Sequence, residues 1–187
     1  MKKVLCVILS VVALVSLSSL RATTVIPPTF DELVGQAEVI FEGTVTNVKS
    51  EWVGEGAERH IMTYVTFKVE DTIKGKHEQT YTMRMLGGTI DGETMAVSDS
   101  PKFKAGDTDI LFVQNNGSQF VPLVGIMHGR FHVKRDQSGR EVVTTNEGEA
   151  VKNVARLGKN QPASASEPDL TPDDFKAAIR NKLQATQ

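Results

Sequence analysis

Short stretches in which apolar and polar side chains alternate are the feature that most limits the folds open to this chain. In residues 39–46, Val39, Phe41, Gly43 and Val45 alternate with Glu42, Thr44 and Thr46, and residues 65–70 alternate strictly. A period of two places every second side chain on one face, as in a strand that is buried on one side. About seven such strands with turns between them favour an antiparallel sandwich or a small closed barrel over alternating strands and helices.

Glycine-containing dipeptides mark the turns between these strands. Asp91-Gly92 lies in the stretch RMLGGTIDGE (84–93), and Asn116-Gly117 follows a short apolar strand. Both dipeptides are preferred in two-residue type I′ hairpin turns, whose central residues need positive φ. A phosphate-binding loop at 84–93 is disfavoured, because no Gly-Lys-Ser/Thr ending and no helical pattern follow the glycines. The stretch therefore indicates a bend, with Gly87-Gly88 forming a bulge or a sharp coil.

Two helices are expected in addition to the strands. Thr29 and Glu32 form a capping-box pattern, which predicts a helix of about two turns. Near the C-terminus, Thr171 is a helix cap and Pro172 suits the first helical position. Apolar side chains then recur at every fourth position, at Phe175, Ile179 and Leu183. This spacing predicts an amphipathic helix whose apolar face docks on the rest of the protein.

The composition divides the chain into four segments. Residues 1–22 join a basic start to a continuous apolar run, and we expect them to be a cleaved signal peptide. Residues 23–157 contain the strands and form the predicted β-barrel domain. Residues 158–170 are poor in apolar side chains and rich in Pro, Ala and Ser, which is typical of a flexible linker. Residues 171–187 form the C-terminal helix.

The expected removal of residues 1–22 bears on where the mature protein is located and on which partners it can bind. The mature protein is expected outside the cytoplasm, periplasmic or secreted, without an integral membrane anchor, since the apolar run barely reaches the ~18 residues that span a bilayer. The loss of three basic residues shifts the formal net charge from −2 to −5, and no basic patch indicates nucleic-acid binding. The only cysteine, Cys6, is lost too, which excludes disulfides and thiol chemistry.

Two stretches carry a family resemblance, AEVIFEGTVTNVKS (37–50) and YVTFKVEDTIKG (64–75). They resemble the netrin-like or tissue-inhibitor-of-metalloproteinase type of OB-fold barrel. They are also similar to a group of exported bacterial proteins of unknown function, whose leucine-Gly-Gly and Pro-x-Phe segment resembles residues 86–106. The resemblance covers about residues 37–134 and implies a five-stranded barrel with a helix packed against it. Inhibition through an N-terminal cysteine is not implied, because the mature chain lacks cysteine.

We therefore expect a mainly β fold: a small antiparallel OB-like barrel with a short N-terminal helix and a C-terminal amphipathic helix after a flexible linker. No catalytic motif is present, since both His-Glu-x-x-His and Gly-x-Ser-x-Gly are missing. His128 and His132 are expected on the outer face of one strand, about 13 Å apart, which is too far to share a metal ion. We expect no catalytic residue, no metal and no cofactor.

Trp52 is the one candidate for partner binding. This single tryptophan lies where the first strand meets the loop 54–57, and it either plugs the barrel end or stays partly exposed as an anchor. The sequence favours an exported non-enzymatic β-barrel module that binds a protein or another extracytoplasmic ligand. The alternatives are an inhibitor of a secreted hydrolase and an enzyme whose site no local motif reveals. The oligomeric state is left open.

Overall fold

Two long strands, β1 (Val39–Val53) and β2 (His60–Lys74), form the hairpin around which the fold is built. The computed structural model describes residues 26–76, 78–159 and 166–186, so the expected signal peptide and the centre of the expected linker lie outside the described residues. The shorter strands are β3 (Thr80–Leu86), β4 (Gly88–Ile90), β5 (Glu93–Met95), β6 (Thr108–Val113), β7 (Arg130–Arg135) and β8 (Glu141–Thr145). The helices are α2 (Phe30–Gln36) and α3 (Pro172–Ala185), with single 3-10 turns η1 (Gly56–Glu58), η2 (Ile126–Gly129) and η3 (Val154–Arg156).

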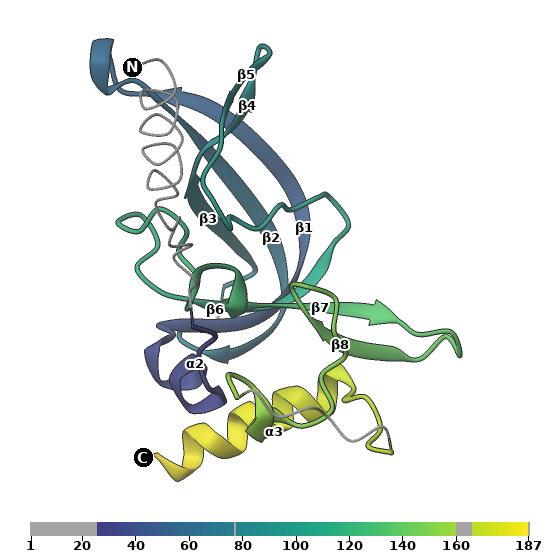
Figure 1. Cartoon of the computed structure of the whole chain (residues 1–187). Coiled ribbons are helices and arrows are strands. Elements are labelled where there is room, and N and C mark those ends of the chain that lie inside the picture. The colour runs from purple at the N-terminus through teal and green to yellow at the C-terminus, as the bar shows by residue number, and fades with distance from the viewer. Residues whose placement is uncertain (1–25, 77, 160–165, 187) are drawn as a thin grey trace, which may run out of the picture.

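Six strands form one antiparallel sheet in the order β3-β2-β1-β6-β7-β8, and β4 and β5 form a separate two-stranded sheet. Strand β1 pairs with β2 from Ile40 to Val53 but with β6 only over Val39–Thr44. The second half of the β1–β2 hairpin therefore extends beyond the rest of the sheet. Figure 1 shows this hairpin and the β4–β5 hairpin at one end of the molecule, with α2 and α3 at the other.

The segment 120–124 joins β3, β2, β1 and β6 into a ring without forming a strand of its own. Leu123 makes an isolated antiparallel bridge with Val113 at the end of β6. On its other side, the carbonyl of Phe120 accepts a hydrogen bond of 2.7 Å from the N–H of Leu86 in β3. These bonds close a small antiparallel barrel. The predicted fold class, mainly β with a short N-terminal helix and a C-terminal helix, is confirmed.

One apolar core fills the inside of this ring. Its members are the inward-facing residues of the barrel strands together with side chains from the connecting segments. Phe67 lies at its centre, with the rings of Phe41 and Phe103 edge-on at 5.5 and 5.6 Å between centroids. The fully or nearly fully buried residues are Phe41, Val45, Val65, Phe67, Met83, Met85, Phe103, Leu111, Val113, Val121 and Leu123. The alternation in the sequence of β1 and β2 arises because every second side chain of these strands faces this core.

A second core lies on the outer face of the sheet, where both helices cover β6, β7 and β8. Phe175 of α3 is fully buried, and its ring centroid lies 4.9 Å from that of Phe131 and 6.2 Å from that of Phe112. Helix α2 adds Phe30, 6.4 Å from Phe175. Both predicted caps are present, since Thr29 and Glu32 form the reciprocal capping box and the Thr171 hydroxyl accepts from the N–H of Asp174. The sheet and α3 thus share one core.

Ion pairs fix α3 across the sheet as well. Lys176 contacts Glu42 and Asp71, and Arg180 donates two hydrogen bonds to Asp71 at 2.7 and 2.8 Å. Partial burial raises the pKa of Asp71, but the hydrogen bond and charge of Arg180, with those of Lys176, outweigh it and leave the pKa lowered. Partial burial likewise opposes the charge of Lys176, yet Glu42, Asp173 and Asp71 leave its pKa raised. Both charged forms are therefore favoured by the docked helix.

The glycine-rich stretch 84–93 is a bend, as predicted. Asp91 and Gly92 connect β4 to β5 with φ of 51° and 83°, the positive values that a type I′ turn requires. Gly87, with φ of 91°, separates β3 from β4. Gly88 has a different reason to be glycine: a Cβ there would overlap the hydroxyl oxygens of Thr63 and Ser50. That close approach brings the β4–β5 hairpin onto the β1–β2 hairpin.

The prediction of a second two-residue hairpin at Asn116-Gly117 is wrong. Positive φ occurs instead at Asn115 and Gly117, and the chain makes a longer turn in which the carbonyl of Asn115 accepts from the N–H of Gln119. The physical reason is the side chain of Asn116, which bonds β3 rather than its own turn. Its Oδ1 accepts from the N–H of Arg84 at 3.0 Å, and its amide donates to the β3 backbone as well. The turn therefore attaches the ring-closing segment to β3.

Candidate functional site

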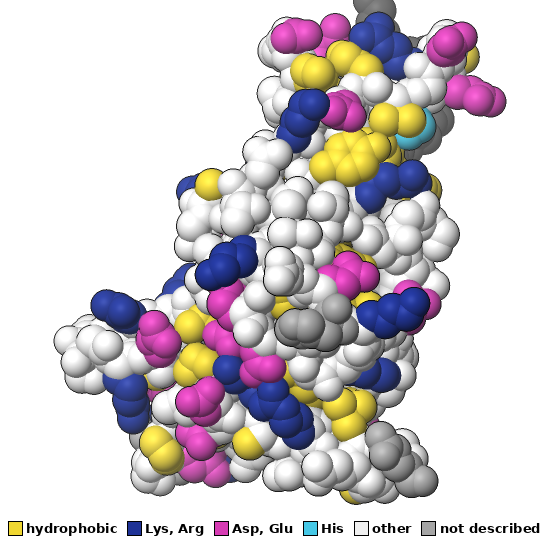
Figure 2. All heavy atoms as spheres, turned by 180° about the vertical axis from the view of Figure 1, so that it is seen from behind, with side chains coloured by type: hydrophobic (Ala, Val, Ile, Leu, Met, Phe, Trp, Pro, Cys, Tyr) yellow, Lys and Arg dark blue, Asp and Glu magenta, His cyan; other side chains and the backbone are white. Residues whose placement is uncertain are grey.

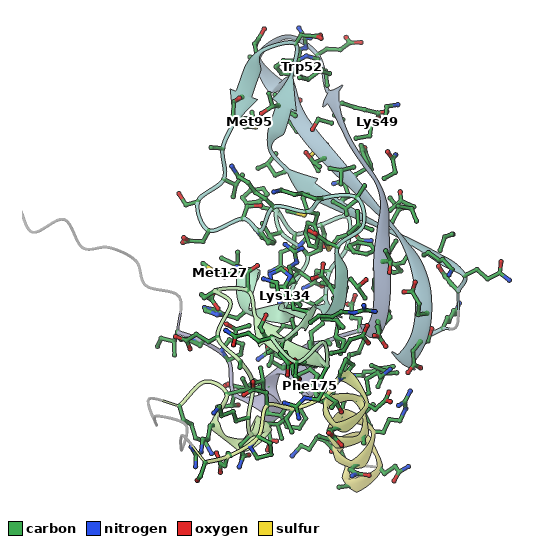
Figure 3. The ribbon with its side chains drawn as sticks, turned by 90° about the vertical axis from the view of Figure 1, so that its right-hand side faces the viewer. Lys49, Trp52, Met95, Met127, Lys134 and Phe175 are labelled. Atoms are coloured by element: carbon green, nitrogen blue, oxygen red, sulfur yellow. The ribbon has the colours of Figure 1, made fainter. Side chains whose placement is uncertain are left out.

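Trp52 lies on the projecting end of the β1–β2 hairpin. Its indole is partly exposed and belongs to neither apolar core. The guanidinium of Arg59, across the hairpin, stacks over the indole with 4.1 Å to the ring centroid. Figure 3 shows Trp52 and Met95 together at this end, far from Phe175 and α3. Of the two positions considered for Trp52, the structure has the one outside the packed barrel.

Hydrophobic side chains gather at the same end of the molecule. Figure 2 shows them on the narrow hairpin end, bordered by charged side chains of both signs. Of the large hydrophobic residues that the structure describes, Val48 in this half of β1 is one of three that are well exposed, with 38% of its surface accessible. The other two, Ile26 and Phe120, lie in other segments. The hairpin end thus combines an aromatic ring, an arginine and apolar surface, as protein-binding surfaces often do.

A cavity of about 340 Å³ opens beside this surface, at the mouth of the barrel. Its walls come from β1, β2 and β3 on one side and from residues 94–103 on the other. Apolar side chains such as Val65, Met85 and Phe103 form its floor, and the hydroxyls of Ser50 and Thr63, 3.0 Å apart, lie in its wall. The glycine-rich bend therefore also shapes a cavity, which the sequence reasoning did not foresee.

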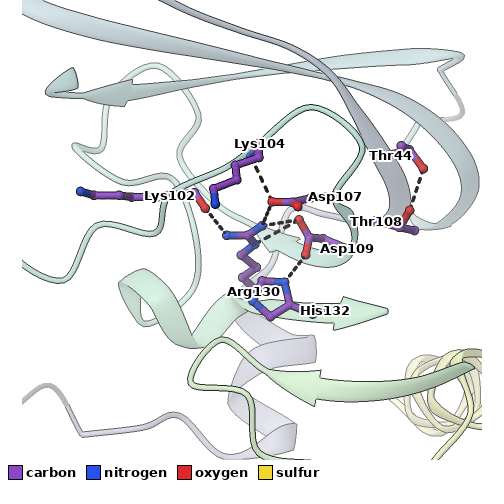
Figure 4. Close-up of polar contacts among 8 residues, drawn as sticks. All are labelled: Thr44, Lys102, Lys104, Asp107, Thr108, Asp109, Arg130 and His132. Atoms are coloured by element: carbon purple, nitrogen blue, oxygen red, sulfur yellow. Dashed lines mark hydrogen bonds and ion pairs between the residues drawn. The ribbon is translucent and has the colours of Figure 1, made fainter. Parts of the chain in front are cut away.

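The second notable site is a buried polar cluster beside Lys102 and Phe103, which also line the cavity (Figure 4). Arg130 and Asp109 are 2% and 0% exposed, and the Nε of Arg130 donates to Asp109 at 3.0 Å. The guanidinium also donates to Asp107 and to the carbonyl of Lys102, and stacks over Phe103 at 3.9 Å. Each of the three guanidinium nitrogens thereby has an acceptor, which favours the burial of such an ion pair.

The two histidines of HGRFH do not lie where the sequence predicted. His128 belongs to the 3-10 turn η2, not to a strand, and its Nδ1 lies 3.8 Å from a carboxylate oxygen of Glu147. His132 is in β7 but its side chain is only 14% exposed, because it turns toward the buried cluster. Asp109 accepts a hydrogen bond from its Nδ1 at 2.7 Å. Asp109 occupies the same face of β6 as the apolar Leu111 and Val113. An acidic residue at such an inward position was the sequence signal that could have revealed this contact.

The Asp109–His132 pair has the geometry of a base held in one tautomer. In a neutral imidazole, a carboxylate at Nδ1 favours the tautomer whose proton is on Nδ1, so that Nε2 is the acceptor nitrogen. Thr144 in β8 is directly opposite His132 in the sheet, and its buried hydroxyl oxygen has no hydrogen-bond partner among the residues that the structure describes. No hydrogen bond between this hydroxyl and His132 is formed, so a nucleophile–base contact is missing. Among the described residues, no group of three or more His, Cys, Asp or Glu side chains could hold a metal ion.

Comparison with known proteins identifies no relative: no family model, curated protein or solved structure matches the chain significantly. The resemblance to netrin-like barrels stays a prediction. Within the described ranges, no helix is both long and apolar enough to cross a membrane.

Proposed function

We propose that this protein is an exported, non-enzymatic β-barrel module that binds an extracytoplasmic protein through the end of the β1–β2 hairpin. The observation that carries the proposal is the position of Trp52, partly exposed on a projecting hairpin and outside both cores. A tryptophan contributes little to stability at such a place. It is, however, the residue type most enriched among the side chains that dominate binding energy.

The surroundings of Trp52 support the same function. Arg59 holds the indole by stacking, which limits the entropy lost when the ring enters a partner. The adjacent cavity, apolar with hydroxyl groups in its wall, suits an aliphatic side chain presented by that partner. The expected signal peptide would deliver this surface to partners outside the cytoplasm.

Capture of partners from the native envelope and culture fluid tests the proposal. Immobilised wild-type protein should retain a stoichiometric protein partner, and Trp52→Ala should weaken that retention at least tenfold. Phe120→Ala is the matched control, since Phe120 is 68% exposed but lies in the ring-closing segment. Equal capture by wild type and Trp52→Ala, or equal loss in both variants, would reject the hairpin end as the binding surface.

A second candidate function is hydrolysis, and the Asp109–His132 hydrogen bond is the observation that favours it. In this case His132 would take a proton from an attacking water through Nε2. A panel of ester, peptide and glycoside substrates tests it. Turnover by the wild type that is lost in His132→Gln but kept in His128→Gln would support the enzyme. Absence of turnover in the wild type, with the partner captured, would leave the binding module.

A further inference from the structure

Among the strands that the structure describes, none lies beside the outer edge of β1 along Asn47–Val53. On that side β1 pairs with β6 only as far as Thr44, and the last backbone bonds join Val45 to Gly106 and Asp107. Within the described part of the chain, no backbone hydrogen bond on that edge involves residues Asn47–Val53. Their pairing with β2 is regular, since the last register shift falls between Val45 and Asn47. Such an edge presents unpaired N–H and C=O groups in the geometry of a further strand.

The side chains of this edge do little to prevent pairing. Exposed edge strands are usually protected by an unpaired lysine, a proline or a bulge. Here the one lysine, Lys49, is neutralised by Glu51 on the same face of the strand, and the two side chains are 65% and 43% exposed. On the opposite face Val48 is 38% exposed. The edge is therefore regular, electrically neutral and partly apolar.

We propose that this edge pairs with the same edge of a second copy, in a two-fold antiparallel register centred on Ser50. The inference goes beyond the proposed function, since it concerns how two copies associate. A two-fold axis perpendicular to the sheet puts the same face of both copies on one side. Residues 48, 50 and 52 of one copy then lie opposite residues of the same set in the other copy, and residues 47, 49, 51 and 53 do likewise. With Ser50 at the axis, Lys49 faces the partner's Glu51, and Glu51 faces the partner's Lys49.

The charges select this register over its neighbours. An axis at Lys49 would bring two lysines face to face, and an axis at Glu51 would bring two glutamates together, which destabilises an antiparallel pair. An axis at Val48 or at Trp52 would leave Glu51 opposite a valine. Only the axis at Ser50 gives both charges an opposite partner and uses the whole free edge, from Asn47 to Val53. The exposed Val48 then packs against the partner's Trp52.

This pairing would make one continuous sheet from two barrels. The two Trp52 side chains would lie on the same face, four residues apart along the strand direction, or about 13 Å at ~3.3 Å per residue. Two copies of the proposed binding surface would then face a partner together. A ligand with two equivalent elements would gain affinity from both contacts.

Charge exchange in the full chain tests the register. The mass of the wild type in solution, measured by sedimentation over a wide concentration range, should rise from one chain to two. Lys49→Glu and Glu51→Lys each place like charges opposite one another and should weaken dimerisation at least tenfold. The double variant Lys49→Glu/Glu51→Lys restores opposite charges and should restore the dimer.

A monomeric wild type at all concentrations would overturn the inference, and so would a dimer that both single variants leave unchanged or that the double variant fails to restore. The centre of the register has its own test. Ser50→Cys, in a Cys6→Ser background, should be joined to a second copy by a short thiol cross-linker, whereas exposed Lys68→Cys in β2 should not. Equal cross-linking of both variants counts against the register. Because the charge variants retain Trp52, Trp52-dependent partner capture without a dimer would reject only this inference.

Discussion

Replacement of Phe175 by alanine should remove a large share of the protein's stability, although this residue belongs to α3, which follows all the strands in the sequence. The side chain is fully buried, and three aromatic rings surround it: Phe30, Phe112 and Phe131, with centroids 4.9 to 6.4 Å away. Truncation of a buried phenylalanine costs about 3 to 5 kcal/mol, from lost burial and from the cavity left behind. Each aromatic contact adds about 0.5 to 1.5 kcal/mol to such a site.

The cavity should not collapse readily, which places Phe175→Ala toward the upper part of that range. Its walls are contributed by α2, β6 and β7, and α3 is also fixed by the ion pairs of Lys176 and Arg180 on the sheet. A domain of this size has a free energy of unfolding of about 5 to 15 kcal/mol. The midpoint of thermal unfolding should consequently fall by roughly 6 to 20 °C.

Urea unfolding followed by circular dichroism measures the effect. Gln184→Ala is the matched control, since it truncates an exposed side chain of the same helix and should change the free energy of unfolding by less than about 0.5 kcal/mol. A loss of less than about 1 kcal/mol in the free energy of unfolding would refute a core shared by the sheet and α3. So would a β-sheet signal whose unfolding transition is the same in Phe175→Ala and in the wild type.

Three other changes test separate parts of the structure. Gly92→Val should cost about 1 to 3 kcal/mol in thermal unfolding, because φ is 83° there, whereas Asp91→Asn should be nearly silent; the reverse order would contradict the turn. Arg130→Met should cost about 3 to 5 kcal/mol by leaving buried Asp109 with His132 as its remaining partner, and a loss no larger than that of an exposed arginine would show the ion pair to be unimportant. Burial raises the pKa of Asp71, but the cations of α3 outweigh burial and leave the pKa lowered. The ionised carboxylate therefore stabilises the fold above its ordinary pKa near 3.8, and this contribution is lost as the pH falls through the lowered pKa. In Asp71→Asn, the midpoint of thermal unfolding should depend less on pH below pH 4 than it does in the wild type.

The strands and caps could be predicted because each depends on neighbours in sequence. Alternation in β1 and β2 reports one buried face, and the capping box of Thr29 and Glu32 is a local exchange of hydrogen bonds. The closure of the barrel could not be predicted in this way. Segment 120–124 contacts β3 through one backbone bond and the end of β6 through an isolated bridge, without the alternation that marks a strand. The function of Asn116 in that closure depends on β3, more than 30 positions earlier in the chain.

The candidate sites likewise differ in whether neighbouring residues in the sequence are enough to predict them. Trp52 was identifiable from its residue type and from the loop beside it. Its side chain is partly exposed because the β1–β2 hairpin extends beyond the strands that pair with it. The cavity is made of residues from three strands and a distant loop, so no local pattern describes it.

The Asp109–Arg130–His132 cluster explains why charge at inward strand positions is informative. Asp109 occupies a position in β6 at which Leu111 and Val113 are buried, and an isolated carboxylate there would be prohibitively costly. Its presence therefore requires a cation from a neighbouring strand, and the register pairs Asp109 with His132, two residues from Arg130. Because Arg130 already pairs with the Asp109 carboxylate through Nε and Nη2, the imidazole is not the only group that compensates its burial. A His132→Gln variant should for this reason fold normally, so that any effect it has on turnover can be attributed to chemistry and not to unfolding, which circular dichroism of the same variant checks directly.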